Sequence, residues 1–235
     1  MKYPESPRIA LPLMYQDWCD LTFLHFRYPR EAVAARVPAP LSVEIIDGSA
    51  WVAVTPFHLR NLRPPLAPAL PWFSHFPETN CRTYVRAPDG TAGVWFFSLD
   101  AARVHAVLGA RLTFGLPYCW SRMRVEMDGR RVTYASRRRW PETSGCTDIE
   151  IEPGELIQQN DLEICLTARF RLYSFLAGKL VRADVDHAPW PLHTARVIRC
   201  EQTLTGAAGL PQPQGPPMAH FSRGIRVRVG RPREV

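Results

Sequence analysis

Short apolar or alternating runs, each bounded by turn residues, recur along most of the chain. Runs of this length, rich in Val, Phe, Tyr and Thr or alternating apolar with polar positions, predict β-strands. The predicted strands cover residues 21–28, 41–47, 50–57, 76–85, 92–99, 121–140 as a hairpin, 171–187 as a second hairpin, 194–204 and 221–230. Asp-Gly pairs at 47–48, 89–90 and 128–129, and the Ala-Gly pair at 177–178, favour tight turns between them.

Helices are predicted to be few and short. Residues 29–38 form one, since Pro29 is tolerated in a first turn and Pro38 ends the pattern. Residues 100–114 form a second, with Asp100 as its N-cap, and a third begins at Asp161. Many strands with few helices indicate a mainly β, antiparallel domain. No repeat or domain boundary is visible, so one domain over 1–235 is expected, with about 1–18 and 231–235 peripheral.

The strand FPETNCRTYV at 76–85 has a markedly polar face. Alternation places Phe76, Glu78, Asn80, Arg82 and Tyr84 on one side, and small, mostly uncharged residues on the other. The small face suits packing against a core. The polar face either meets solvent or lines a cavity, and convergent polar groups of this kind favour the cavity.

The chain carries 29 basic and 22 acidic residues, and its only lysines are Lys2 and Lys179. The densest basic stretch, 121–140, alternates with apolar residues, which is the pattern of a hairpin with one wet side. Its charge admits an alternative function in nucleic-acid or partner binding through Arg137, Arg138 and Arg139. No recognition helix, RNA-binding signature or zinc-finger spacing accompanies this charge, so nucleic acid is the weaker alternative.

Other patterns narrow the class of protein. The six cysteines include no C-x-x-C pair and stand mostly among apolar neighbours, which predicts reduced thiols in or near the core. No apolar run has the length of a membrane span, so no membrane partner is expected. The first residues lack the apolar core and cleavage site of a signal peptide, and a cytoplasmic location is therefore expected.

Several short segments also occur in the order found in one family of proteins. They are WVAVTPF (51–57), FPETNCRTYV (76–85), GVWFFSLD (93–100), LPY (116–118), HAPWPL (187–192) and HFSRG (220–224). Together they resemble the YqjF-like family of uncharacterised proteins, within the acetoacetate decarboxylase-like superfamily. The resemblance implies a mainly β fold of the α+β kind, with an antiparallel cone- or barrel-like sheet around a central cavity and a few peripheral helices. It also implies a homo-oligomer.

The resemblance implies two candidate catalytic residues. In the decarboxylases a glutamate on the corresponding strand points into the cavity, and Glu78 resembles it. Their Schiff-base lysine follows a Gly-x-Pro turn after a helix, and Tyr118 stands at that place here. A phenol cannot form a Schiff base, and neither Lys2 nor Lys179 occupies the matching position. We therefore expect Glu78 to act as an acid or base and Tyr118 as a donor to a substrate carbonyl.

The substrate-binding candidates surround this pair. Arg82 is predicted to hold a carboxylate or enolate oxygen by a charge-assisted hydrogen bond, with Asn80 and Tyr84 on the same strand face. His25 and Arg27 share one face of the strand at 21–28 and are assigned to the same ligand site. For His25 the alternative is that it only fills the core.

No cofactor or metal is expected. Asp186, His187 and His193 are metal-ligand residue types, but prolines interrupt the segment and no metal-binding spacing is present. His187 and Trp190 are expected to stabilise a loop or close one end of the sheet. Nucleotide-binding and serine-hydrolase motifs are also missing from the sequence.

The predicted function is binding of a small organic acid or carbonyl compound in the central cavity. The sequence leaves open whether acid–base chemistry then converts this ligand, so it does not decide whether the protein is an enzyme. A noncatalytic ligand-binding or sensor module would use the same cavity. The basic nucleic-acid or partner-binding protein is the less favoured alternative.

Overall fold

Thirteen strands and four short helices make up the computed structural model, which describes residues 3–235. In chain order the elements are β1 (Met14–Tyr28), α1 (Arg30–Ala34), β2 (Ser42–Val43), β3 (Ala50–Arg63), β4 (Phe76–Arg86), β5 (Ala92–Ala101), α2 (Val104–Phe114), β6 (Tyr118–Asp128), β7 (Arg131–Trp140), β8 (Cys146–Leu156), α3 (Asp161–Thr167), β9 (Arg171–Leu176), β10 (Lys179–His187), β11 (His193–Gln202), α4 (Leu204–Ala207), β12 (Met218–Val229) and β13 (Arg233–Glu234).

The strands form one sheet that closes on itself. Nine of the described strands make a ring in the order β1-β3-β4-β5-β6-β7-β8-β11-β12, and β12 pairs again with β1. Among the strands of residues 3–235 almost every pairing is antiparallel, and only the short β5–β6 and β5–β9 contacts are parallel. The predicted antiparallel, barrel-like sheet is therefore confirmed. Closure leaves fewer free strand edges, which would otherwise expose unpaired backbone groups.

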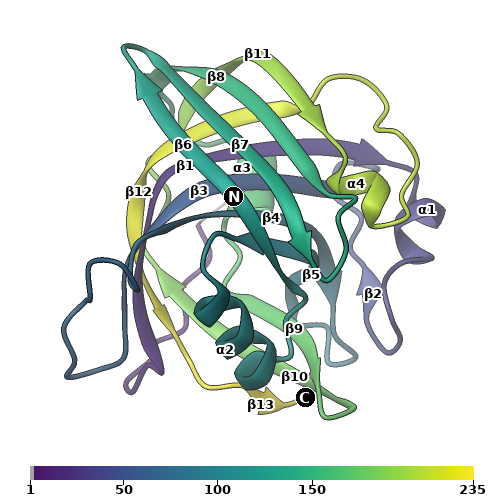
Figure 1. Cartoon of the computed structure of the whole chain (residues 1–235). Coiled ribbons are helices and arrows are strands. Elements are labelled where there is room, and N and C mark those ends of the chain that lie inside the picture. Colours follow the sequence, from purple (N-terminus) through teal and green to yellow (C-terminus); the bar gives the residue numbers. More distant parts are fainter. Residues whose placement is uncertain (1–2) are drawn as a thin grey trace.

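A second closure divides the interior in two. Strands β9 and β10 link β5 to β12, so β12, β1, β3, β4 and β5 form a wall shared by two closed sheets. Figure 1 shows β6, β7, β8 and β11 above this wall and β9 and β10 below it. One apolar core contains Cys81 from β4 together with Tyr134 and Ile149 from the upper strands. The opposite face of β4 meets the lower interior, where the cavity lies.

Most predicted strands and helices are confirmed, although many begin or end at other residues than predicted. The strand predicted at 76–85 is β4, and the hairpins at 121–140 and 171–187 are β6–β7 and β9–β10. Ala177 and Gly178 have φ of 50° and 78°, as a tight hairpin turn requires. The third helix begins at Asp161, as predicted, and Asn160 and Glu163 form a capping box there.

Some local predictions are wrong. The strand predicted at 41–47 is only Ser42–Val43, and the helix predicted at 29–38 is only Arg30–Ala34. Residues 14–18 are not peripheral, because they begin β1 and pair with β12. The strand Cys146–Leu156 is missing from the prediction, although Thr147, Ile149 and Ile151 alternate there with acidic residues.

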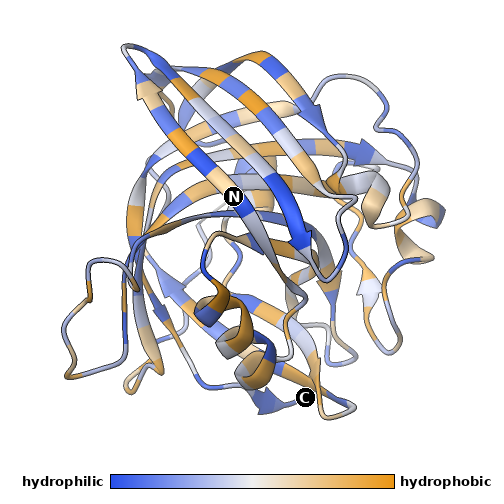
Figure 2. Ribbon diagram, viewed as in Figure 1, coloured by the Kyte–Doolittle hydropathy of each residue, from blue (hydrophilic) through white to orange (hydrophobic). Residues whose placement is uncertain are grey.

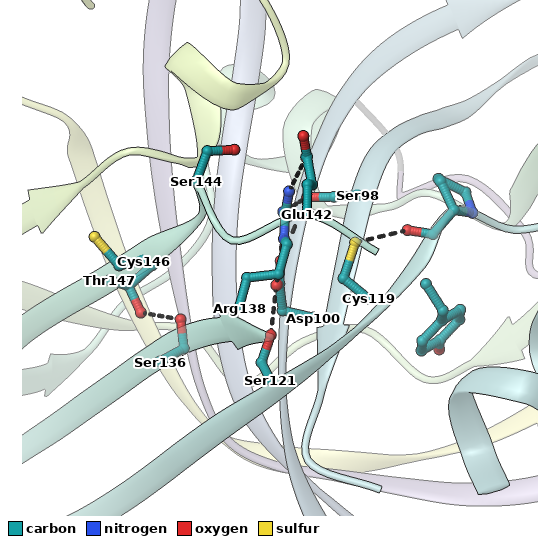
Figure 3. A network of polar contacts seen from close by, with 12 residues as sticks. Ser98, Asp100, Cys119, Ser121, Ser136, Arg138, Glu142, Ser144, Cys146 and Thr147 are labelled. Carbon is teal, nitrogen blue, oxygen red and sulfur yellow. Dashed lines mark hydrogen bonds and ion pairs between the residues drawn. The ribbon is translucent and has the colours of Figure 1, made fainter. Parts of the chain in front are cut away.

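The prediction of Asp100 as a helix N-cap is also wrong. Asp100 lies in β5, and α2 begins four residues later at Val104. Its carboxylate is fully buried and accepts two hydrogen bonds of 2.9 Å from Arg138 and one of 2.7 Å from Ser121. Figure 3 shows this network joining β5, β6 and β7. A buried carboxylate needs such a partner, and here tertiary pairing decides its role instead of helix capping.

The arginine-rich hairpin has one wet side, as predicted, but Arg138 is an exception. Arg137 and Arg139 are exposed, whereas the side chain of Arg138 is 2% exposed because it follows the buried face of β7. The colouring in Figure 2 shows hydrophilic and hydrophobic residues alternating along β6 and a continuous hydrophilic stretch at the end of β7. One of the three arginines proposed for nucleic-acid binding is therefore buried in the core.

None of the helices within residues 3–235 has the length and apolar composition needed to cross a membrane.

Candidate functional site

The lower interior contains a cavity of about 430 Å³ with mostly apolar walls. Its apolar lining comes from β5, α2, the turn after α2, β10 and β12, and includes Val94, Phe96, Leu99, Phe114, Leu116, Val185 and Val229. Its polar lining includes three residues of β4 and others from α2, β6, β9 and β10. Such a cavity, apolar with a small number of convergent polar groups, is the usual form of a small-molecule site.

The polar face of β4 forms part of the cavity wall. Glu78, Asn80 and Arg82 all line the cavity, and all three are buried. Pairing with β3 on one side and β5 on the other holds the strand in the middle of the shared wall. The two-residue period of a strand then sends these three side chains to the same side.

Glu78 and Tyr118 form a hydrogen-bonded pair in the cavity wall, with Glu78 buried and Tyr118 half-buried. The Tyr118 hydroxyl donates to the Glu78 carboxyl group, at 3.2 Å from Oε1 and 3.1 Å from Oε2. Burial raises the pKa of Glu78 to about 8, and the Tyr118 hydrogen bond only partly offsets this. The pKa of Tyr118 also rises well above its usual value, through burial and the neighbouring Glu78 charge. Both groups are therefore largely protonated near neutral pH.

The turn after α2 places Tyr118 in this position. Gly115 ends the helix in the left-handed conformation, with φ of 64°, and its N–H donates to the carbonyl of Arg111 at 3.2 Å. Leu116 and Pro117 then lead into β6, which pairs in parallel with β5 through Leu99 and Tyr118. The Arg111 guanidinium donates to the Tyr118 carbonyl at 2.6 Å, which ties the helix to the strand.

Arg82 lies toward a different part of the cavity. Within residues 3–235 no carboxylate pairs with its guanidinium, and its buried Nε atom has no hydrogen-bond partner. Instead the guanidinium carbon lies 5.6 Å from the centre of the Phe23 ring. Burial lowers the pKa of Arg82, but an arginine stays charged throughout the physiological range. An unpaired buried cation is costly, and an anionic ligand would satisfy it.

Tyr84 and His25 lie behind Arg82 and do not form the cavity wall. The Tyr84 hydroxyl and His25 Nε2 are 2.8 Å apart, and both residues are buried. Burial, with a smaller effect of Arg82, lowers the pKa of His25 well below its usual value, which keeps the imidazole neutral. These two residues support the arginine without lining the cavity themselves.

The structure places Arg27 outside the site. Its side chain is 45% exposed, pairs with Asp47 at 2.5 Å and lies over the Trp51 ring. The assignment of Arg27 to substrate binding is therefore wrong. Arg27 follows His25 by two residues, but β1 reaches the edge of the interior between them, so the same face becomes solvent-exposed.

Arg169 and His187 are among the polar lining residues that were not predicted as ligand-binding candidates. Arg169 lies between α3 and β9, stacks over the Tyr84 ring at 4.9 Å and pairs with Glu44 at 2.5 Å. His187, expected to stabilise a loop, lies against Trp190 with ring centres 5.4 Å apart, and both line the cavity. Arg169 stands in no recognisable motif, so only the closure of the sheet brings it to the site.

The described residues offer no grouping of three or more His, Cys, Asp or Glu side chains that could hold a metal ion. All six cysteines are free thiols, and Cys81 and Cys119 are buried. Lys179 lies exposed in the β9–β10 hairpin and pairs with Glu234 at 2.9 Å, away from the cavity. Lys2 lies outside the described residues.

Comparison with known proteins decides the family. Residues 15–226 match the DUF2071 family of uncharacterized conserved proteins. The protein YqjF of Bacillus subtilis is 36% identical over 225 residues, which cover 93% of each chain. The chain belongs to the DUF2071 family. The predicted YqjF-like relationship is thereby confirmed.

Solved structures show the wider fold of this DUF2071 protein. Acetoacetate decarboxylase from Legionella pneumophila superposes with a TM-score of 0.67 at 13% identity, covering 100% of this chain and 92% of that one. The enduracididine biosynthesis enzyme MppR, complexed with pyruvate, gives a TM-score of 0.66 at 11% identity, covering 98% and 93%. At this identity the likeness establishes the acetoacetate decarboxylase-like fold.

Proposed function

We propose that this DUF2071 protein binds a small organic carboxylate that also carries a carbonyl group, in the cavity between β4 and α2. Arg82 holds the carboxylate, and the Glu78–Tyr118 pair faces the carbonyl. The observation that carries the proposal is the buried Arg82 guanidinium, which has no carboxylate partner in residues 3–235 and shares a strand face with Glu78, the hydrogen-bond partner of Tyr118. The pyruvate complex of MppR, which has the same fold, supports this ligand class.

The pair is suited to moving protons without a covalent intermediate. Tyr118 donates a hydrogen bond to the carbonyl oxygen, and the protonated Glu78 can transfer its proton to that oxygen. The carboxylate left on Glu78 can then accept a proton from the carbon next to the carbonyl. The sum of the two transfers interconverts keto and enol forms and needs no other reactant.

Binding can be tested by calorimetry with pyruvate and with acetoacetate. Arg82→Met should weaken both by roughly tenfold to a hundredfold, as expected when a charge-assisted hydrogen bond is lost. Arg137→Met, which removes an exposed arginine of β7, is the matched control and should leave the affinity unchanged. Equal affinities for wild type and Arg82→Met would contradict the proposal.

Catalysis and simple binding are separated by hydrogen–deuterium exchange at the carbon next to the ligand carbonyl, followed by NMR. Enzyme-catalysed exchange that Glu78→Gln abolishes, with binding retained, indicates proton transfer by Glu78. Binding without accelerated exchange indicates a ligand-binding or sensor module.

Two broader expectations form part of this proposal. A homo-oligomer is supported by the outer face of α2, where Leu108 is 48% and Leu112 is 77% exposed. Light scattering at micromolar concentration that gave only the 26.7 kDa chain would contradict it. A cytoplasmic location is the second expectation, and fractionation of the source cells tests it.

A further inference from the structure

The two polar ends of the cavity are set apart on β4. Glu78 and Arg82 are four residues apart on one strand, which separates their Cα atoms by about 13 Å. In a 2-oxo acid such as pyruvate the carboxylate carbon and the carbonyl carbon are bonded directly to each other. A ligand of that kind reaches both residues only if their side chains lean together.

The side chains instead turn to opposite sides of β4, one toward β1 and the other toward β6. The Arg82 guanidinium lies over Phe23 of β1, and Arg169 lies over the adjacent Tyr84. The Glu78 carboxyl turns to Tyr118 of β6, on the other side of the strand. The basic end and the acid pair are thus separate subsites.

The space between the subsites is apolar and large. Phe96, Leu99 and Leu116 belong to the same buried cluster and line the cavity. Between them the cavity wall on β4 offers the amide of Asn80, whose buried Oδ1 has no partner among the described residues. A volume of about 430 Å³ lies in the range of cavities that hold drug-sized ligands, well above the size of a three-carbon acid.

We infer that the natural ligand is a medium-chain oxo acid whose carbonyl is separated from its carboxylate by several apolar carbon atoms. Arg82 binds the carboxylate, the Phe96–Leu99–Leu116 wall covers the chain, and Tyr118 and Glu78 receive the distant carbonyl. This inference rests on the proposed function and specifies its substrate class.

Positional isomers of one acid test the inference, because they share length, charge and hydrophobicity. Affinities of 2-oxooctanoate, 5-oxooctanoate and 7-oxooctanoate are measured by calorimetry, with octanoate as the reference that lacks a carbonyl. We expect at least one of the 5-oxo and 7-oxo isomers to bind tenfold or more tightly than the 2-oxo isomer. Tyr118→Phe should remove most of this preference while each isomer still binds about as well as octanoate. An unfolding curve of the variant verifies that it is folded.

The outcomes separate the inference from the proposed function. If 2-oxooctanoate binds as tightly as the other isomers or more tightly, and Arg82→Met still weakens binding, the inference is wrong and the proposed function stands. If the isomer preference is present but Tyr118→Phe leaves it unchanged, the acid pair does not receive the carbonyl and the inference is again wrong. If pyruvate, acetoacetate and every oxooctanoate fail to bind, the proposed function itself fails.

Discussion

At the scale of single residues, the site depends on a carboxyl group that burial keeps protonated. Glu78 has no cationic partner within residues 3–235, and its neighbours are the Tyr118 hydroxyl and the apolar wall. An acid in such a place exchanges protons near neutral pH, which suits acid–base work on a bound carbonyl compound. The same burial lowers the stability of the folded protein at any pH where Glu78 ionises.

This cost predicts a pH dependence of folding. The pKa of Glu78 is about 8 in the folded protein, compared with 4.5 for the unperturbed group. Between these values the folded state keeps the proton and the unfolded state releases it, so stability falls as pH rises, by about 1.4 kcal/mol per pH unit. Glu78→Gln lacks this titration. The free energy of unfolding of the variant minus that of the wild type should therefore rise by about 4 kcal/mol between pH 5 and pH 8. Urea unfolding at each pH measures this difference. A constant difference would contradict the raised pKa.

A second residue-scale prediction concerns covalent chemistry. Wild-type protein should form no borohydride-reducible adduct with acetoacetate, because Tyr118 stands at the position of the decarboxylase lysine and Lys179 is outside the cavity. Tyr118→Lys should gain an adduct, since burial would lower the pKa of the new amine. Mass spectrometry measures both. An adduct on Lys179 of the wild-type protein would contradict this account of the site.

At the scale of elements, one turn connects the helix to the reactive end of the cavity. Gly115 closes α2, and a Cβ atom placed there would lie 2.0 Å from the Phe175 carbonyl oxygen of β9. The glycine therefore meets two requirements, a left-handed backbone and a close approach of two chains. The direction in which β6 leaves this turn fixes Tyr118 opposite Glu78.

Gly115→Ala should accordingly lower the free energy of unfolding by about 2 kcal/mol or more, because a left-handed non-glycine residue is strained and the backbone must also shift. Gly109→Ala is the matched control in the same helix. A Cβ atom at Gly109 meets nothing within 4 Å, and helix propensity favours alanine by up to about 1 kcal/mol. Urea unfolding of the two variants compares them. Equal stabilities would show that the turn tolerates a side chain.

At the scale of the whole molecule, distant strands are held together by one buried ion pair. Asp100 of β5 and Arg138 of β7 form a bidentate pair, and Ser121 of β6 donates to the same carboxylate. The parallel β5–β6 pairing is short, so this network reinforces the point where the upper strands join the shared wall (Figure 3). It also lies beside the strand that carries Tyr118.

Removing Arg138 should therefore damage the fold. Arg138→Ala leaves Asp100 buried without its cation, and we expect a loss of about 3–5 kcal/mol in the free energy of unfolding. Arg137→Ala, on the exposed face of the same strand, should change it by less than about 0.5 kcal/mol. Urea unfolding measures both. Similar small losses would mean that the pair contributes little. Tests of nucleic-acid binding should consequently use Arg137 and Arg139 alone.

Much of the architecture could be predicted from the sequence, because strands and tight turns depend on local patterns. Two-residue alternation predicted β4 and its polar face, and the Ala-Gly pair predicted the turn of the β9–β10 hairpin. The absence of a lysine at position 118 is likewise visible in the sequence alone. Each of these features depends on residues that are close together along the chain.

Only the tertiary structure decided which partner each polar side chain meets. Asp100 looks like a helix cap until β7 brings Arg138 to it from 38 residues away. Arg27 looks like a ligand residue until the end of β1 proves to be solvent-exposed, and Arg169 reaches the cavity only because β9 and β10 close the lower sheet. Burial and ion pairing are set by contacts between strands far apart in sequence, and a local pattern carries no information about them.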